Sequence, residues 1–120
     1  MRRHCLADRL ILLIEDEPLI ALEVDNALRA AGARVVSAGY LESALFTAEH
    51  PALSAAVVDL RLGDNSSTTV CRRLSRLGVP FVIHTAYPGD FAASSWPNVP
   101  VITKPANPQR IIAALVSLLE

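Results

Sequence analysis

The chain has 120 residues, the size of one globular domain, and 52% of them are hydrophobic against 19% charged, which excludes a disordered chain. The net charge of −1 excludes the basic surface that nucleic-acid or polybasic membrane binding requires. The longest apolar run has six residues, Ile111 to Val116, whereas a membrane-spanning helix needs about 20. Cys5 and Cys71 follow no metal-binding spacing, so we expect reduced thiols and a cytoplasmic protein.

Patterns typical of strands and helices alternate along the first half of the chain. Residues 10–14 are continuously apolar, which indicates a strand buried on both faces. Pro18 then suits the first turn of a helix, which Gly32 can end in a left-handed conformation. We predict further strands at 34–38 and 55–58. The apolar face of the first helix comprises Ile20, Val24, Ala27, Leu28 and Ala31, and that of a second helix, stopped before Pro51, comprises Leu41, Ala44, Leu45 and Ala48.

The second half continues the alternation. Residues 63–66 read as a loop, with Ser66 or Ser67 as a helix cap, and residues 81–83 as a fourth strand. Residues 87–100 are rich in Pro and Gly, so any fourth helix is expected to be short and irregular. A fifth strand opens at residues 99–102, where a proline favours a sheet edge. The third helix ends before Gly78, and its inward face comprises Val70, Cys71, Leu74 and Leu77. The last helix is capped by Asn107 and begins at Pro108. Its inward face comprises Ile111, Ile112, Leu115, Leu118 and Leu119.

Five strand–helix units favour an α/β fold with a parallel sheet and helices on both faces. At this length the natural architecture is a doubly wound five-stranded sheet of order 2-1-3-4-5. Such a sheet binds ligands at the carboxyl ends of its strands, where the order reverses between strands 1 and 3. We expect residues 1–120 to form a single domain with no output domain.

Polar residues stand where the predicted strands end. Glu15 and Asp16 follow the first strand, Asp59 follows the third, Thr85 the fourth and Lys104 the fifth. Because strands 1 and 3 are neighbours, three carboxylates would converge and repel one another. A hard divalent cation such as Mg²⁺ is the usual solution for such a set of oxygen ligands.

This arrangement suggests phosphoryl chemistry. A carboxylate beside Mg²⁺ can attack a phosphoryl group and form an aspartyl-phosphate, while the metal and an ammonium group neutralise charge on the transferring oxygens. Asp59 is the best candidate for the nucleophile, because it lies centrally between the acidic pair and the side that carries Thr85 and Lys104. The hydroxyl of Thr85 could bind a phosphoryl oxygen.

Four motifs, each at a strand end, carry a family resemblance: ILLIEDEP (11–18), VVDLRLGD (57–64), HTA (84–86) and TKP (103–105). Together they resemble the receiver domain of response regulators, a CheY-like, flavodoxin-like fold, over essentially the whole chain. The resemblance implies a cis Lys104–Pro105 peptide bond. It implies Asp59 as phosphoacceptor, Asp16 as direct ligand of Mg²⁺ or Mn²⁺, Glu15 as ligand through water, the backbone carbonyl of Arg61 as a further ligand, and Thr85 and Lys104 as phosphoryl-binding residues.

Two features depart from the usual receiver pattern. Val101 occupies the position, three residues before the lysine, where receivers carry a switching aromatic side chain. Gly63 stands in the loop after Asp59 that usually contains a proline. Residues 83–87 are instead similar to the Phe-Ala-Thr-Gly-Tyr motif of an atypical group of single-domain receivers. We therefore predict that Tyr87 is the switch residue and that the segment after it is a mobile output surface.

Several residues favour ordinary structural interpretations. We expect His84 to pack or hydrogen-bond beside its strand and Cys71 to lie in the core. Phe91 and Trp96 either pack onto the sheet or anchor a partner, with packing the favoured reading. The remaining expectations are surface positions for His4 and His50 and a solvated helix face for Arg72, Arg73 and Arg76.

The resemblance implies a stand-alone response regulator in two-component signalling or a phosphorelay. It would accept a phosphoryl group from a histidine kinase or a histidine phosphotransfer protein, and signal by binding a protein partner or by passing the group on. We expect a monomer or weak dimer without nucleic-acid or membrane partners.

A classical enzyme is disfavoured, because haloacid-dehalogenase-type phosphatases carry a second acid where this chain has Arg61. The remaining alternative is a receiver-like module that binds partners independently of phosphorylation, through residues 87–100.

Overall fold

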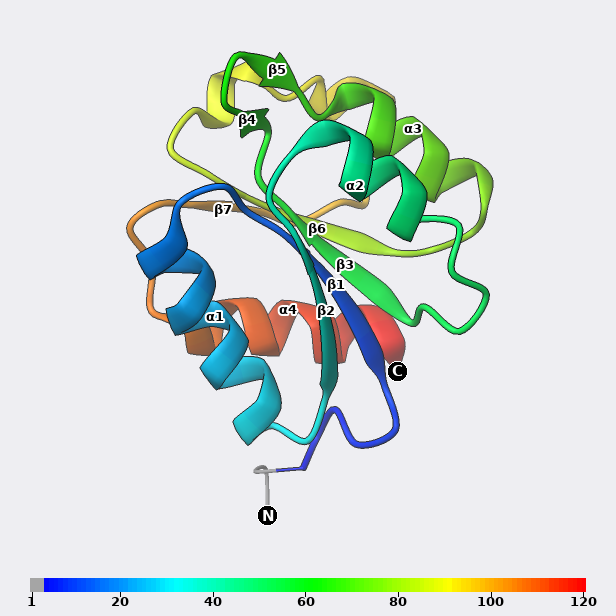
Figure 1. The fold of residues 1–120 in the computed structure, drawn as a ribbon, viewed down its shortest axis with the longest axis vertical. Coiled ribbons are helices and arrows are strands. Elements are labelled where there is room, and N and C mark those ends of the chain that lie inside the picture. The colour runs from blue at the N-terminus through cyan, green and yellow to red at the C-terminus, as the bar shows by residue number, and fades with distance from the viewer. Residues whose placement is uncertain (1–3) are drawn as a thin grey trace.

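The computed structural model describes residues 4–120 and contains a parallel five-stranded sheet between two layers of helices (Figure 1). The order of the strands along the sheet is β2-β1-β3-β6-β7. This order confirms the predicted doubly wound architecture, with the reversal between β1 and β3. The strands are β1 (Leu10–Ile14), β2 (Arg34–Ala38), β3 (Ala55–Val58), β6 (Phe81–Thr85) and β7 (Val101–Thr103).

The helices cover the two faces of the sheet in pairs. On one face α1 (Pro18–Ala30) packs beside α4 (Pro108–Leu119), and on the other α2 (Leu41–Thr47) packs beside α3 (Thr68–Arg76) (Figure 1). Each face therefore has its own apolar core, which forms because the three central strands, β1, β3 and β6, are buried on both sides. No helix among residues 4–120 has both the length and the apolar character needed to span a membrane.

The predicted helix ends are confirmed by their local geometry. Gly32 follows α1 with a φ of +96°, and a Cβ atom at this position would lie 3.2 Å from the backbone nitrogen of Ala7. Asn107 caps α4, since its Oδ1 accepts a hydrogen bond of 2.9 Å from the backbone N–H of Gln109. Pro108 then occupies the first turn, where a missing N–H costs nothing.

The segment after β3 differs from its prediction as a plain loop. It forms a small antiparallel hairpin, β4 (Arg61–Leu62) and β5 (Asn65–Ser66), whose turn has Gly63 at a φ of +60°. Ser67 occupies the N-cap position of α3, but its hydroxyl donates to the backbone carbonyl of Asp59 at 2.5 Å. Ser66 Oγ instead accepts from the first backbone N–H of the helix, at 3.2 Å. The hairpin is thus tied to the end of β3.

The helical structure of the proline-rich segment is short and irregular, as expected. It forms two single 3₁₀ turns, η1 (Pro88–Asp90) and η2 (Ala93–Ser95). The Phe91 ring is buried and stacks on Trp96 with 5.5 Å between centroids, and Trp96 meets Phe81 of the sheet edge-on at 6.3 Å. The packing interpretation of these two aromatic residues is therefore confirmed.

Three boundary predictions need correction. β6 extends to Thr85, two residues beyond the predicted end, because two polar residues continue the ladder to β7. β7 begins at Val101 rather than at residue 99, although it is the predicted edge strand. Leu77 was expected on the inner face of α3, but this helix ends at Arg76 and the Leu77 side chain is 48% exposed.

Candidate functional site

The sheet register brings two acidic strand ends side by side. Ile14 of β1 is paired with Val58 of β3, so the next residues, Glu15 and Asp59, are neighbours. The ladder continues past the strand ends, because the backbone N–H of Asp59 donates to the carbonyl of Ile14 at 3.0 Å. Glu15 and Asp59 are each only 6% exposed. Two buried carboxyl groups thus share one edge of the sheet.

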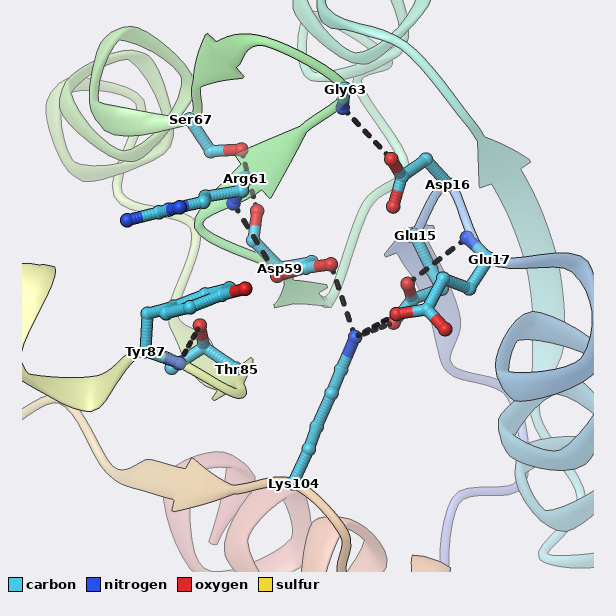
Figure 2. Close-up of polar contacts among 10 residues, drawn as sticks. All are labelled: Glu15, Asp16, Glu17, Asp59, Arg61, Gly63, Ser67, Thr85, Tyr87 and Lys104. Atoms are coloured by element: carbon cyan, nitrogen blue, oxygen red, sulfur yellow. Dashed lines mark hydrogen bonds and ion pairs between the residues drawn. The ribbon is translucent and has the colours of Figure 1, made fainter.

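A buried lysine lies between these two carboxyl groups (Figure 2). Lys104 Nζ is 2.8 Å from Glu15 Oε1 and 3.1 Å from Asp59 Oδ2, and the Lys104 side chain is 8% exposed. A third carboxylate, that of Glu17, lies 3.8 Å away. The backbone N–H of Lys104 donates to the carbonyl of Thr85, which fixes the lysine at the end of β7. The Lys104–Pro105 peptide bond is cis, as predicted.

Burial and charge shift the acid–base properties of this cluster. Burial, together with the negative charge of Asp59, raises the pKa of Glu15 to about 7, although the hydrogen bond from Lys104 acts to lower it. Burial also acts to lower the pKa of Lys104, but its hydrogen bonds and ion pairs with Glu15 and Asp59 outweigh burial and raise it. We therefore expect a charged ammonium group facing a carboxyl group that titrates near neutral pH.

Three acidic residues provide oxygen ligands in one place. One oxygen from each of Glu15, Asp16 and Asp59 lies within 4.8 Å of the others. Asp16 is exposed and accepts a hydrogen bond of 2.8 Å from the backbone N–H of Gly63, which links the acidic pair to the β4–β5 hairpin. Carboxylate oxygens, completed by water, are the ligands that Mg²⁺ and Mn²⁺ prefer, so these residues fit such a cation.

The predicted residues from the other strands line the same region. A cavity of about 210 Å³ is bounded by Asp16, Asp59, Lys104 and Tyr87, among others. Thr85 is fully buried beside it, and its Oγ1 accepts a hydrogen bond of 3.0 Å from the backbone N–H of Tyr87 (Figure 2). A hydroxyl group that accepts in this way keeps its own proton to donate. Residues from four strand ends therefore surround one cavity.

The side chain of Arg61 makes contacts that could not be expected from the sequence, in which only its backbone carbonyl is predicted to belong to the site. The Arg61 guanidinium pairs with Asp90 Oδ2, at 2.7 Å from Nη2 and 3.0 Å from Nε. It also lies over the ring of Tyr87, 3.8 Å from the centroid. Tyr87 itself is 50% exposed. Arg61 and Asp90 lie 29 positions apart in the sequence, so no local pattern could have revealed this pair.

The histidines and cysteines take structural positions. His84 is buried in β6, and its Nε2 has no hydrogen-bond partner among residues 4–120, so the packing interpretation holds without the hydrogen bond. Burial, with the charge of Lys104, lowers the pKa of His84 to about 4. Burial raises the pKa of the Cys71 thiol to about 12. His4 and His50 are exposed, as predicted.

The arginines of α3 form a largely solvated face. Arg72 and Arg76 are exposed, as predicted. Arg73 is partly covered and pairs with Glu49 at 2.7 Å. This pair links α3 to the end of α2 on the surface, away from the acidic cluster.

Comparison with known proteins identifies the family. No protein-family model matches the chain. The response regulator receiver protein from Sinorhizobium medicae superposes with a TM-score of 0.84 at 23% identity, over 92% of this chain and 94% of its own. SdrG from Sphingomonas melonis is 32% identical with a TM-score of 0.75, over 90% of this chain and 96% of SdrG. The chain belongs to the response-regulator receiver family.

Longer relatives match this chain over only part of their own length. The phyllosphere-induced regulator PhyR of Methylorubrum extorquens is 31% identical over 114 residues, which are 91% of this chain but 43% of PhyR. The chain thus spans less than half the length of this curated relative. A response regulator from Burkholderia pseudomallei, solved with a phosphorylated aspartic acid, a calcium ion and citrate, is 26% identical, with a TM-score of 0.79 over 92% of this chain and 70% of that chain.

Proposed function

We propose that this receiver acts as a response regulator by accepting a phosphoryl group on Asp59. Membership of the family implies a phosphoacceptor role in two-component signalling. The observation that carries the assignment to Asp59 is its place in the cluster. It is a buried carboxylate 3.1 Å from the Lys104 ammonium and within 4.8 Å of the oxygens of Glu15 and Asp16. The phosphodonor would be a histidine kinase or a histidine phosphotransfer protein.

The transfer requires one bond to form and one to break. An Asp59 carboxylate oxygen attacks the phosphorus, and the bond between phosphorus and the donor's imidazole nitrogen breaks, which leaves an acyl phosphate on Asp59 and a free histidine. Lys104 Nζ, already beside Asp59 Oδ2, neutralises charge on the phosphoryl oxygens. The hydroxyl of Thr85 donates to one of those oxygens. The protein assists its own modification and is not a classical enzyme.

The acidic residues would hold the cation that this chemistry needs. Asp16 and Asp59 are the direct ligands in our proposal, Glu15 acts through water, and the backbone carbonyl of Arg61 completes the protein's share. Bound Mg²⁺ or Mn²⁺ would supply positive charge at the transferring oxygens. The Burkholderia pseudomallei response regulator, solved with both a phosphorylated aspartic acid and a calcium ion, supports a divalent cation in a protein of this kind.

Signalling would follow through the segment after Thr85. Tyr87 is half exposed, and its backbone N–H donates a hydrogen bond to the Thr85 hydroxyl. A movement of the Thr85 hydroxyl would therefore change a hydrogen bond of Tyr87. Val101 leaves the usual aromatic switch position without a ring. We therefore propose that Tyr87 is the side chain that changes conformation on phosphorylation. The signal would then pass on through binding of a protein partner or through onward phosphotransfer.

Intact mass spectrometry tests the proposed phosphorylation. The chain is incubated with Mg²⁺ and acetyl phosphate, and separately with a histidine-phosphorylated donor protein. We expect a gain of one phosphoryl group, which is lost in Asp59→Ala and on chelation of the metal. Asp64→Ala is the matched control, because Asp64 is an exposed aspartate of the β4–β5 turn. A folded chain that gains nothing from either donor would contradict the proposal and favour a phosphorylation-independent binding module.

A further inference from the structure

The Arg61 side chain forms a bridge across the mouth of the acceptor site. Its backbone N–H faces Asp59 Oδ1 at 3.4 Å, and its guanidinium lies over the ring of Tyr87 (Figure 2). The same guanidinium pairs with Asp90 in η1. The segment Tyr87–Asp90 is thereby attached by side-chain contacts to the residue two positions after Asp59. This bridge is separate from the Lys104 cluster, which lies on the opposite side of Asp59 (Figure 2).

The Arg61 bridge lies close enough to Asp59 for its charge to interact with a phosphoryl group there. Arg61 and Tyr87 line the same cavity as Asp59 and Lys104. Arg61 is also only two residues from Asp59, so rotation of its long, flexible side chain can bring the guanidinium over the cavity. Arginine is suited to this position, because its planar fork binds phosphoryl oxygens with two parallel hydrogen bonds.

The charges around Asp59 favour such a movement. Lys104 already faces three carboxylates, at 2.8, 3.1 and 3.8 Å, so its positive charge is shared. Phosphorylation replaces the single charge of Asp59 with a phosphoryl group of about −2. The present partner of Arg61 is weakly held, because the Arg61 and Asp90 side chains are 52% and 47% exposed and water and salt screen their attraction.

We propose that Arg61 is a third phosphoryl-binding residue, beside Lys104 and Thr85, and that its pairing with Asp90 keeps it away from Asp59 until Asp59 is phosphorylated. The guanidinium then leaves Asp90 and the Tyr87 ring and binds oxygens of the phosphoryl group. Asp90 and Tyr87 then lose the side chain that contacts both of them, and the η1 turn is free to open. This inference rests on the proposed phosphorylation of Asp59.

The release is confined to a short stretch. Phe91 is buried against Trp96, so the chain stays anchored just beyond η1. The two amides of the turn are measurable reporters, because the N–H of Asp90 donates to the carbonyl of Tyr87 at 3.0 Å and that of Phe91 to Pro88 at 3.2 Å. Opening of η1 exposes both amides to exchange with solvent.

Two NMR measurements test the inference, on wild type and on Asp90→Asn. The first follows the Nε–H resonance of Arg61, assigned by its loss in Arg61→Lys, before and after addition of acetyl phosphate and Mg²⁺. The second follows hydrogen exchange at the amides of residues 90 and 91. Glu49→Gln is the matched control, because it breaks the similarly exposed pair with Arg73 on another part of the surface. Intact mass reports phosphorylation in every sample.

The expected results are specific. In the wild type, phosphorylation shifts the Arg61 resonance and speeds exchange at residues 90 and 91 by about tenfold or more. In Asp90→Asn the faster exchange is present before phosphorylation, and the Arg61 resonance still shifts when the phosphoryl group arrives. Glu49→Gln behaves as the wild type. An unchanged Arg61 resonance in a sample whose mass shows phosphorylation overturns the inference alone. Failure of Asp59 to gain a phosphoryl group overturns it together with the proposed function.

Discussion

Magnesium affinity should depend on pH through Glu15. Burial raises the pKa of this carboxyl group to about 7, so it holds a proton over part of the neutral range. A divalent cation attracted by the acidic cluster competes with that proton. If binding requires ionised Glu15, the ionised fraction falls from about 0.9 at pH 8 to about 0.1 at pH 6. The Mg²⁺ dissociation constant should therefore rise about tenfold, a loss of about 1.4 kcal/mol of binding free energy.

Isothermal titration calorimetry of the unphosphorylated protein at pH 6, 7 and 8 measures this directly. Glu15→Gln should bind Mg²⁺ with little dependence on pH, because the titrating group is gone. Asp16→Asn is the matched comparison: it should weaken binding at every pH but keep the slope. A wild-type dissociation constant that changes less than twofold between pH 6 and pH 8 would refute the assignment of a raised pKa to Glu15.

Three further results follow from burial. Lys104→Met should lower the free energy of unfolding at pH 8 without divalent cation by about 3 kcal/mol, since two buried carboxylates lose their cation, against under about 1 kcal/mol for Arg73→Met, whose ion pair is exposed. Urea unfolding measures the loss in each variant. Equal losses would contradict a buried cluster of Lys104 with Glu15 and Asp59. His84 has a lowered pKa, so its stability contribution is present above pH 6.5 and lost as pH falls toward 4. The difference in free energy of unfolding between His84→Leu and wild type should therefore be about 2 kcal/mol more in favour of the variant at pH 5 than at pH 7.5. A difference that does not depend on pH would rule this out. In the native protein at pH 8 a thiol reagent should modify Cys5 but not Cys71, which is buried; two reactive thiols would show that the core opens.

Much of the fold could be predicted because the central strands are apolar on both faces. The bounds of β1, β2 and β3 match the predicted ranges, since their apolar stretches end at polar residues or turns. β6 was predicted two residues too short, because His84 and Thr85 are polar and yet buried at the sheet's carboxyl edge. The acidic cluster could also be anticipated, since strand order alone brings Glu15, Asp16 and Asp59 together.

Contacts between distant loops could not be predicted. The pair of Arg61 with Asp90 joins a hairpin to a 3₁₀ turn, and neither element has a periodic pattern that fixes its position. The hydroxyl of Ser67 looked like a helix cap but donates to the carbonyl of Asp59, because the hairpin folds the chain back onto the end of β3. Side-chain partners of this kind depend on loop conformation, which the local sequence does not determine.

The central claim is that Asp59 receives the phosphoryl group, and locating the modified residue tests it most directly. After incubation with acetyl phosphate and Mg²⁺, borohydride reduction converts an acyl phosphate on aspartate to homoserine, which peptide mass spectrometry places in the chain. We expect homoserine at position 59 and none when the metal is chelated. Homoserine at Asp16 or at another aspartate, with Asp59 unchanged, would contradict it.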